Sequence, residues 1–423
     1  MLHDRLAQDL YAEICRIPII DTHSHIDPRQ PTSRALDDIL GYHYYTELAH
    51  SSGMEPSLLD LSVDPRERVR AVLYHMSCFD NTAAYEWFIE IARAFLGFQG
   101  ERLTLADCTW LSESAERTMS RPGWEDHVLR QSNIEKVFLT NEFDDPLTGF
   151  NASRYLPCLR GDDLLFRLGE ADVRRRLASF TGIEPVDAGG LRQAIAALFT
   201  HFGKHAGRAC AVSLPCNFHP RPVDEPELNK ALASLARGET GSESVAPLGV
   251  FWLLAELCRN FKIPFCLMIG VTRGVYAHGV PQGRDLFDQR VSLIDYAPLF
   301  NAFPEVTFVV SVLSAGQNQE LVSYSWIFPN VIASGHWWYS NIPAYIEQAT
   351  RARLGGVPKT KQIGYFSDMY KLEFGLPKFN MYRRILARVL ADDFIRPRIY
   401  TESQSIDVAR LLLRDNARRI FNA

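Results

Sequence analysis

The sequence of 423 residues lacks the features that mark several broad classes of protein. Its eight cysteines are scattered and form no C-x-x-C pair, which argues against a disulfide framework and against a cysteine zinc module. Glycine (26 residues) and proline (23 residues) occur at ordinary frequencies, which excludes collagen-like and low-complexity chains. We therefore expect a soluble globular protein of a reducing cytoplasm.

Charge and hydropathy narrow the expected partners. The chain has 45 Lys and Arg against 50 Asp and Glu, so no basic surplus exists to recruit nucleic acid. The longest apolar run, near Val306–Leu313, is far shorter than the ~20 residues of a membrane-spanning helix. Residues Met1–Ile14 predict an amphipathic helix without the apolar core of a signal peptide. We expect neither a nucleic-acid nor a membrane partner, and homo-oligomer formation is left open.

Eight short runs rich in Val, Ile and Phe predict β-strands. Most are apolar throughout, as expected of parallel strands that are buried on both faces. The runs are Ile17–Asp21, Ile134–Leu139, Tyr155–Leu159, Ala209–Leu214, Ile263–Ile269, Val306–Leu313, Val331–Ser334 and Ile363–Ser367. Helical patterns lie between them or follow the last, including Leu191–Phe202, Pro247–Phe261, Tyr339–Ala352, Lys378–Ala391 and Ser405–Phe421.

This alternation predicts an α/β fold, a (β/α)₈ barrel that comprises residues 1–423 as a single domain. An open, doubly wound sheet is the alternative, but no G-x-G-x-x-G motif follows the first strand. The long segment between the first two strands has helical patterns at Pro65–Met76 and Thr82–Phe98. We expect residues 28–130 to form a helical insertion near the mouth of the barrel.

Side chains suited to chemistry follow most of the predicted strands. In a barrel of this type the carboxyl ends of the strands meet at one face, where active sites are built. We therefore expect the following residues to gather there: His23 and His25, Asn141 through Asp145, Arg160, Thr272 and Arg273, Ser314 and Gln317, His336 through Trp338, and Asp368.

The histidine pair after the first strand is the strongest local signal. His23 and His25 leave an extended segment at i and i+2, so both imidazoles can reach one cation. Two solvated loop histidines are the alternative, but Asp21 can hydrogen-bond and orient this loop. Barrel closure places the eighth strand beside the first, so Asp368 is the expected third ligand. A turn residue or helix N-cap is the other interpretation of Asp368.

Other candidates have stronger structural alternatives. His201 and His205 lie one helical turn apart but lack the Glu of an H-E-x-x-H motif, so a solvated helix face is favoured. Trp337 and Trp338 could equally pack in the core or line the active site. Arg160, at the end of an apolar strand, predicts bidentate binding of a carboxylate or phosphate, with an internal ion pair as the alternative.

Together these motifs resemble the amidohydrolase superfamily and, within it, the shorter, divergent uronate isomerases. The resemblance runs in order from about residue 16 to the C-terminus. It is carried by Asp21 through His25, Tyr42 through Tyr44, Leu139 through Asp145, Leu159 and Arg160, Ala211 through Pro215, Ile263 through Val271, Asn318 through Leu321, His336 through Tyr339, and Ser367 with Asp368.

The resemblance implies a distorted barrel of the metal-dependent hydrolase type and one divalent metal ion, usually Zn²⁺. It also implies a sugar acid as the small-molecule substrate, with interconversion of D-glucuronate and D-fructuronate, or of D-galacturonate and D-tagaturonate. The family's residues correspond to His23, His25 and Asp368 as metal ligands, His43 and Tyr44 facing the substrate, and Arg160 after the third strand.

Two departures from the family concern the substrate more than the fold. The family's arginine two residues after the metal-binding aspartate is Tyr370 here. The Ser-Arg pair after the sixth strand is replaced by Ser314 and Ala315. Tyrosine cannot bind a carboxylate as a guanidinium does. Lys371 or Arg273 could supply the missing charge.

For an isomerase of this kind, Asp368 or Tyr44 would transfer protons. Asp368 is preferred, because a carboxylate beside a cation stays ionised. Arg160, helped by Arg273, would bind the substrate carboxylate, and the pocket would be lined by His43, Trp338 and Tyr370. The alternatives are a mononuclear metal hydrolase acting on a lactone or small amide, and a sugar-acid-binding protein that has lost turnover. A binuclear site is not supported, because Met268 stands where the related hydrolases have histidine.

Overall fold

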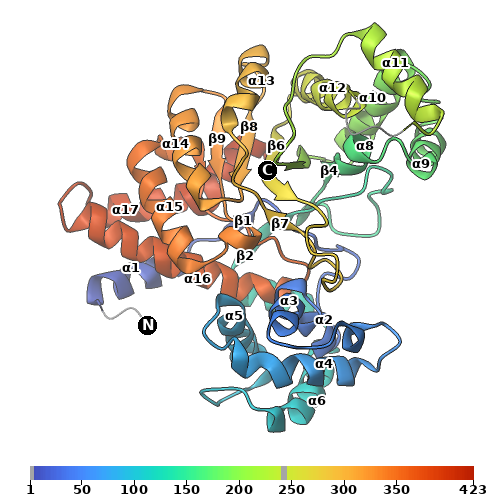
Figure 1. Cartoon of the computed structure of the whole chain (residues 1–423). Coiled ribbons are helices and arrows are strands. Elements are labelled where there is room, and N and C mark those ends of the chain that lie inside the picture. The colour runs from blue at the N-terminus through green and yellow to red at the C-terminus, as the bar shows by residue number, and fades with distance from the viewer. Residues whose placement is uncertain (1–3, 240–244) are drawn as a thin grey trace.

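The computed structural model describes residues 4–239 and 245–423, and its strands form a distorted (β/α)₈ barrel, as predicted (Figure 1). Three parallel strands form one sheet, in the order β1 (Ile19–Asp21), β2 (Ile134–Phe138) and β3 (Tyr155–Leu156). Six more continue around the barrel, in the order β4 (Cys158–Arg160), β5 (Ala209–Pro215), β6 (Phe265–Thr272), β8 (Phe308–Val312), β9 (Val331–Ser334) and β10 (Gln362–Ile363).

All eight expected strands are present, with three differences. The third is divided at Pro157, which has no N–H to donate: β3 pairs with β2, and β4 pairs with β5. The eighth ends as a strand at Ile363, not at Ser367 as predicted. A short antiparallel strand, β7 (Leu286–Phe287), pairs with the end of β6 and was not predicted from the sequence.

The segment between β1 and β2 is helical, as expected, and lies below the barrel in Figure 1. Local signals explain where its helices begin. Asp64 accepts a hydrogen bond from the first turn of α4, which has proline at its first position, and Thr82 does the same for α5. The helices are α2 (Leu36–Leu40), α3 (His43–Ser51), α4 (Pro65–His75), α5 (Ala83–Ile91), α6 (Cys108–Met119) and α7 (Trp124–Ser132).

The remaining helices surround the strands, with α9 to α12 on one side and α14 to α17 on the other (Figure 1). They are α1 (Arg5–Cys15), α8 (Asp162–Phe166), α9 (Ala171–Thr181), α10 (Ala188–Lys204), α11 (Glu225–Ala236), α12 (Ala246–Phe261), α13 (Ala297–Ala302), α14 (Asn318–Ile327), α15 (Pro343–Gly356), α16 (Gly375–Leu390), α17 (Glu402–Arg410) and α18 (Asn416–Phe421).

The predicted helices agree with these except at some ends and at π-helical turns. A π-helical turn, Leu411–Asp415, interrupts the expected helix Ser405–Phe421. The first three residues of the helix expected at Met1–Ile14 lie outside the described residues. In the described part of the chain, no helix combines the length and apolar character needed to cross a membrane.

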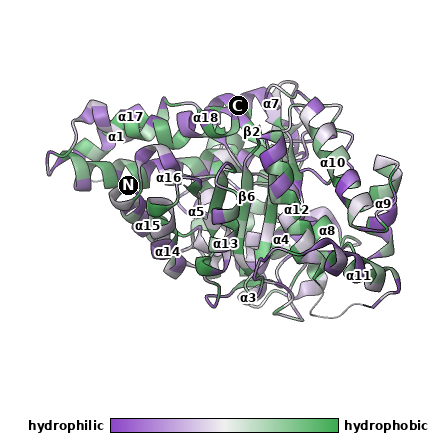
Figure 2. Cartoon of the chain, turned by 90° about the horizontal axis from the view of Figure 1, so that it is seen from above, coloured by the Kyte–Doolittle hydropathy of each residue, from purple (hydrophilic) through white to green (hydrophobic). Residues whose placement is uncertain are grey.

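The strands of the barrel are mostly buried, whereas the short β7 is exposed. Every residue of β8 and β9 is buried, which matches their mostly apolar sequences. Hydrophobic residues gather among the central strands, including β6, and on the helix faces turned toward them (Figure 2). We therefore expect the polar side chains of a functional site at the ends of the strands.

The barrel closes without a regular ladder between β10 and β1 in the described structure. Instead, the buried Asp21 carboxylate accepts hydrogen bonds from the backbone N–H (2.9 Å) and the hydroxyl of Ser367. Two backbone bonds complete this seam, from Asp368 N to His23 O (3.1 Å) and from His25 N to Met369 O (2.8 Å). The seam brings residues from the two ends of the barrel sequence into contact.

Candidate metal and active site

Closure of the seam assembles the three predicted metal ligands. The Nε2 atoms of His23 and His25 lie 3.5 and 3.3 Å from Oδ1 of Asp368, and the potential ligand atoms all lie within 4.8 Å of one another. The buried Nε2 of His23 has no hydrogen-bond partner. Two imidazoles and one carboxylate suit a divalent cation such as zinc and leave a coordination position open. These residues could therefore hold a metal ion.

Thr140, two residues after the end of β2, determines which nitrogen of His25 is free. Its hydroxyl donates its one proton to the carbonyl of Ser24 (2.6 Å), so it must accept a hydrogen bond from Nδ1 of His25 (3.0 Å). The Nε2 atom of His25 then carries the lone pair and faces Asp368. Thr140 thus fixes both the orientation and the tautomer that metal binding requires.

Replacing Thr140 by Val should therefore weaken zinc binding by about 10-fold or more, the effect typical of removing a ligand's hydrogen-bond partner. Valine has nearly the same shape but cannot hold the His25 tautomer. Competition with a chromophoric chelator measures the affinity. Unchanged zinc affinity in a folded Thr140→Val protein would contradict this role.

The ionisation states of the ligands favour a cation. Burial raises the pKa of Asp368, but the adjacent imidazoles of His23 and His25 outweigh this effect and hold that pKa well below its ordinary value. Burial lowers the pKa of His25. At neutral pH the site therefore presents a carboxylate and a neutral imidazole, the forms that bind metals.

The three ligands lie in the wall of a cavity of about 470 Å³ at the carboxyl ends of the strands. Of the residues predicted to form the site, this cavity is lined by His23, His25, His43, Arg160, Arg273, Trp338, Asp368 and Tyr370. Tyr44 is buried behind the wall, with its hydroxyl 3.5 Å from Oδ2 of Asp368. The structure thus brings all of these side chains to one place.

The two arginines that line the cavity differ in how firmly they are held. Arg160 makes only long contacts, 3.4 Å each, to Glu142 and Asp162. Arg273 binds Asp285 at 2.7 Å and Ser213 at 3.1 Å. The internal ion pairs considered for Arg160 therefore exist, but they are the weaker set, and Arg160 is freer to turn onto an anionic ligand.

Aromatic rings form much of the remaining wall. Tyr370 stacks on His25, with ring centroids 4.9 Å apart and planes 24° from parallel. Trp337, which is buried in a hydrophobic cluster, and Trp338, which packs against it, both line the cavity. Lys371 binds the carbonyl of Gln30 and does not line this cavity. The expectation that Lys371 supplies the missing charge is not supported.

His43 should make the stability of the metal-free protein depend on pH. Burial lowers the pKa of His43 to about 4, well below the ordinary 6.5. The unfolded chain therefore binds more protons than the native state between these values, and stability falls as the pH decreases. Chemical denaturation should show about 2 kcal/mol less stability at pH 5 than at pH 7 from this residue. The His43→Gln variant should lose that part of the pH dependence. Equal pH dependence of stability in the wild type and in His43→Gln would refute this role of His43.

Other sequence candidates have structural roles. Nε2 of His201 contacts the carbonyl of Asp145 (3.0 Å), and Nδ1 of His205 contacts the carbonyl of His201 (2.9 Å). Both imidazoles are half-buried and each contacts a backbone carbonyl, so they do not form the solvated helix face that was expected. Ala315 is exposed and lies outside the cavity lining.

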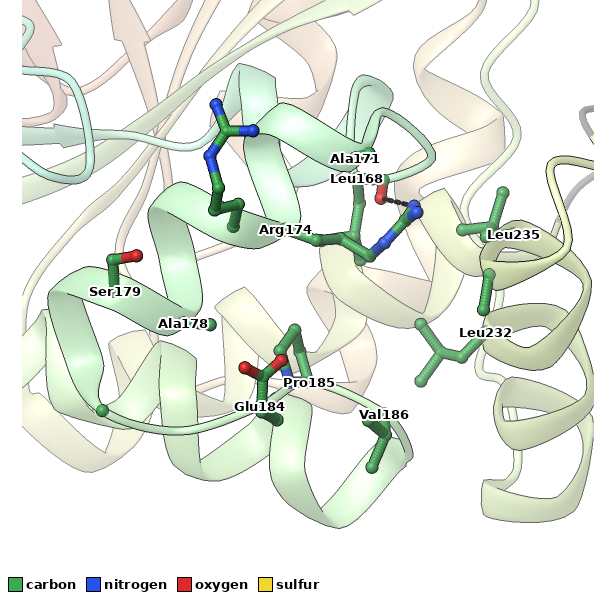
Figure 3. Close-up of a pocket in the computed structure, with 13 residues that line it drawn as sticks. Leu168, Ala171, Arg174, Ala178, Ser179, Glu184, Pro185, Val186, Leu232 and Leu235 are labelled. Atoms are coloured by element: carbon green, nitrogen blue, oxygen red, sulfur yellow. Dashed lines mark hydrogen bonds between the residues drawn. The ribbon is translucent and has the colours of Figure 1, made fainter.

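A second cavity, of about 560 Å³, lies beside α9 and α11, away from the strand ends (Figure 3). There Arg174 bonds the carbonyls of Leu168 and Gly169, so its guanidinium is engaged within the chain. This cavity lacks the ligand triad and adds nothing to the candidate site.

Several residues of the site were missed in the sequence. Thr140 could have been noticed, because it directly follows a predicted strand. The others lie on segments that only the fold brings together: Asp162, Ser213, Gln282 and Asp285. The last two lie near β7, the strand that sequence patterns did not indicate.

Comparisons with known proteins relate the chain to one group of enzymes. No protein-family model matches the chain. A uronate isomerase of Rhizorhabdus wittichii is 23% identical over 96% of this chain and 92% of its own length. The structures of uronate isomerase from Thermotoga maritima and of glucuronate isomerase from Caulobacter crescentus both superpose with a TM-score of 0.90. The Thermotoga maritima structure is 18% identical and covers 99% of this chain and 98% of its own. The Caulobacter crescentus structure is 16% identical and covers 100% of this chain and 97% of its own. The chain is thus similar to uronate isomerases along nearly its whole length and has the same fold.

Proposed function

We propose that this protein is an aldose–ketose isomerase of hexuronates, of the type that converts D-glucuronate to D-fructuronate. The observation that carries this proposal is one cavity in which the triad His23, His25 and Asp368 shares the lining with the loosely held Arg160. An isomerase of sugar acids needs both: a cation-binding centre at the carbonyl end and a cationic side chain for the carboxylate. The similarity to uronate isomerases supports the same reaction.

One divalent ion, zinc, would be held by His23, His25 and Asp368. When bound, it supplies Lewis-acid stabilisation of the negative charge that develops during isomerisation. Arg160 binds the substrate carboxylate through two parallel N–H donors and so sets the register of the sugar. Tyr370 and Trp338 confine the sugar between apolar faces in the cavity.

The reaction moves a proton from the carbon next to a carbonyl to the neighbouring carbon. Asp368 is the proposed base, because its carboxylate is held ionised in the buried site. Burial holds the pKa of Tyr44 well above its usual value, so the phenol stays protonated and donates to Oδ2 of Asp368. Tyr44 therefore orients this carboxylate, and a role as an ionised base is not favoured.

We further propose that residues 1–423 act as one unit in the cytoplasm. Residues 28–130 would then be part of the active site and not a separate module, because they contain His43, which lines the cavity, and Tyr44. All eight cysteines are free thiols, which is compatible with a reducing compartment.

Proton NMR of the zinc-loaded protein with D-glucuronate or D-galacturonate in D₂O tests this function. The expected result is the appearance of ketose signals with deuterium incorporated at carbon. If both sugars stay unchanged while the protein retains zinc, hexuronate isomerisation is refuted. Release of acid from a lactone under the same conditions would instead indicate the hydrolase alternative.

A further inference from the structure

Lys378 is a fully buried cation directly beneath the candidate metal site. It lies near the start of α16 and has no exposed surface. Its ammonium group donates to the carbonyl of Ser367 (2.7 Å) and to the hydroxyl of Tyr42 (3.1 Å). Both acceptors are neutral oxygens, although burying an ammonium is costly without strong compensation. We therefore expect this buried lysine to have a structural or functional role.

The hydrogen bonds of Lys378 lead to Asp368. The hydroxyl of Tyr42 donates its proton to the backbone carbonyl of Asp368 (2.9 Å). Lys378 therefore holds the carbonyl of Ser367 directly and the carbonyl of Asp368 through one tyrosine. Asp368 has a φ of 51°, in the left-handed region that costs free energy for residues other than glycine. Fixing two successive carbonyls stabilises this unfavourable conformation.

Asp21 holds the same segment from the opposite side. Its carboxylate binds both the backbone N–H and the hydroxyl of Ser367. With Lys378 on the carbonyl, every polar atom of Ser367 is engaged by a buried charged side chain. This arrangement replaces the ladder that β10 and β1 do not form in the described structure.

The surroundings keep the ammonium charged. Four aromatic rings lie 4.8 to 6.0 Å from Nζ, those of Tyr42, Tyr44, Trp87 and Phe374. Burial lowers the pKa of Lys378 to about 8, against the opposing effect of the Asp368 and Asp21 carboxylates. Lys378 thus serves as a shared counter-charge for one structural carboxylate and one candidate ligand.

We propose that Lys378 is a positioning residue, which, through Ser367 and Tyr42, holds Asp368 in the conformation that binds the metal ion. The inference rests on the metal site of the proposed function. The proposal predicts in which direction the affinity for the metal ion changes when Lys378 is replaced. An ammonium acting only through its charge would repel a bound cation, so its removal would tighten binding. A positioning role predicts that its removal weakens binding.

Arg383 provides a matched control on the same helix. It is 2% exposed, and its Nη2 donates to the carbonyls of Ile17 (3.4 Å) and Ser132 (3.5 Å), outside the cavity. Lys378→Met and Arg383→Met each remove one buried cation that bonds backbone carbonyls. Both should lower the free energy of unfolding, but only Lys378→Met should change the metal site.

Zinc affinity is measured by competition with a chromophoric chelator, without sugar, for the full-length wild type and both variants. We expect Lys378→Met to bind zinc about 10- to 100-fold more weakly, and Arg383→Met to bind it as the wild type does. Equal or tighter binding by Lys378→Met, or the same loss in Arg383→Met, would overturn the proposal.

Tyr42→Phe tests the same inference if Lys378→Met does not fold. It keeps the ammonium and removes only the bridging hydroxyl, so zinc should bind about 10-fold more weakly. Wild-type affinity in Tyr42→Phe would overturn the positioning role. Failure of the wild type to bind zinc would instead refute the metal site itself. Zinc binding with these variant effects, but without isomerisation, would refute only the proposed reaction.

Discussion

Replacing Asp368 by Asn is expected to abolish tight zinc binding and, with it, isomerisation. Asparagine keeps the size of the side chain but loses the negative charge that the cation needs. The change removes a direct ligand, so zinc affinity should fall by more than the ~100-fold that is the upper range for losing a ligand's hydrogen-bond partner. Zinc retained per chain after dialysis and ketose formation by NMR measure the two effects.

Asp285→Asn is the control for this variant. Asp285 lines the same cavity but pairs with Arg273 and not with the histidines, so zinc binding should be unchanged. The seam bonds use the backbone of Asp368, and Asp368→Asn should therefore remain folded, which thermal unfolding can verify. A folded Asp368→Asn protein that retains zinc like the wild type would contradict the assignment of the triad.

Replacing Arg160 by Met should raise KM for hexuronates by about 30- to 150-fold. The change removes a charge-assisted pair of hydrogen bonds to the substrate carboxylate, worth about 2–3 kcal/mol. The chemistry occurs at the other end of the sugar, so kcat should change less than KM. Steady-state kinetics with a hexuronate and with the corresponding neutral aldose measure the effect, and the loss should be far larger for the acid.

Arg273→Met tests whether the second arginine shares this role. Arg273 is already paired with Asp285, and its side chain is 52% exposed, so we expect less than about a 10-fold increase in KM. An equal loss on acidic and neutral sugars in Arg160→Met would show that Arg160 supports the structure of the site and does not bind the carboxylate.

Much of the fold could be predicted because buried parallel strands have a distinctive composition. Val306–Leu313 and Val331–Ser334 are mostly apolar, and they contain the observed strands β8 and β9, respectively. The errors occur where tertiary structure replaces local preference. Pro157 divides one strand between two partners, and the segment after Ile363 is held by Asp21 and not by a ladder.

In the candidate site, too, some residues could be recognised from local sequence and others only from tertiary structure. His23 and His25 could be recognised from their spacing after an apolar strand. Asp368 required the further inference that the barrel closes on itself. Lys378 was not recognised, because it lies within the periodic pattern of a helix, where a lysine ordinarily faces solvent.

The sequence by itself determined the βα order, the histidine pair and the family resemblance, because these depend on residue types and spacings along the chain. Tertiary structure decided that Tyr370 stacks on His25, that Arg273 is engaged by Asp285 while Arg160 is only loosely held, and that Lys371 lies outside the cavity. His25 and Tyr370 follow different strands and meet only when the barrel closes, whereas Arg273 and Asp285 meet through the connection between β6 and β7. Short-range sequence patterns carry no information about either distance.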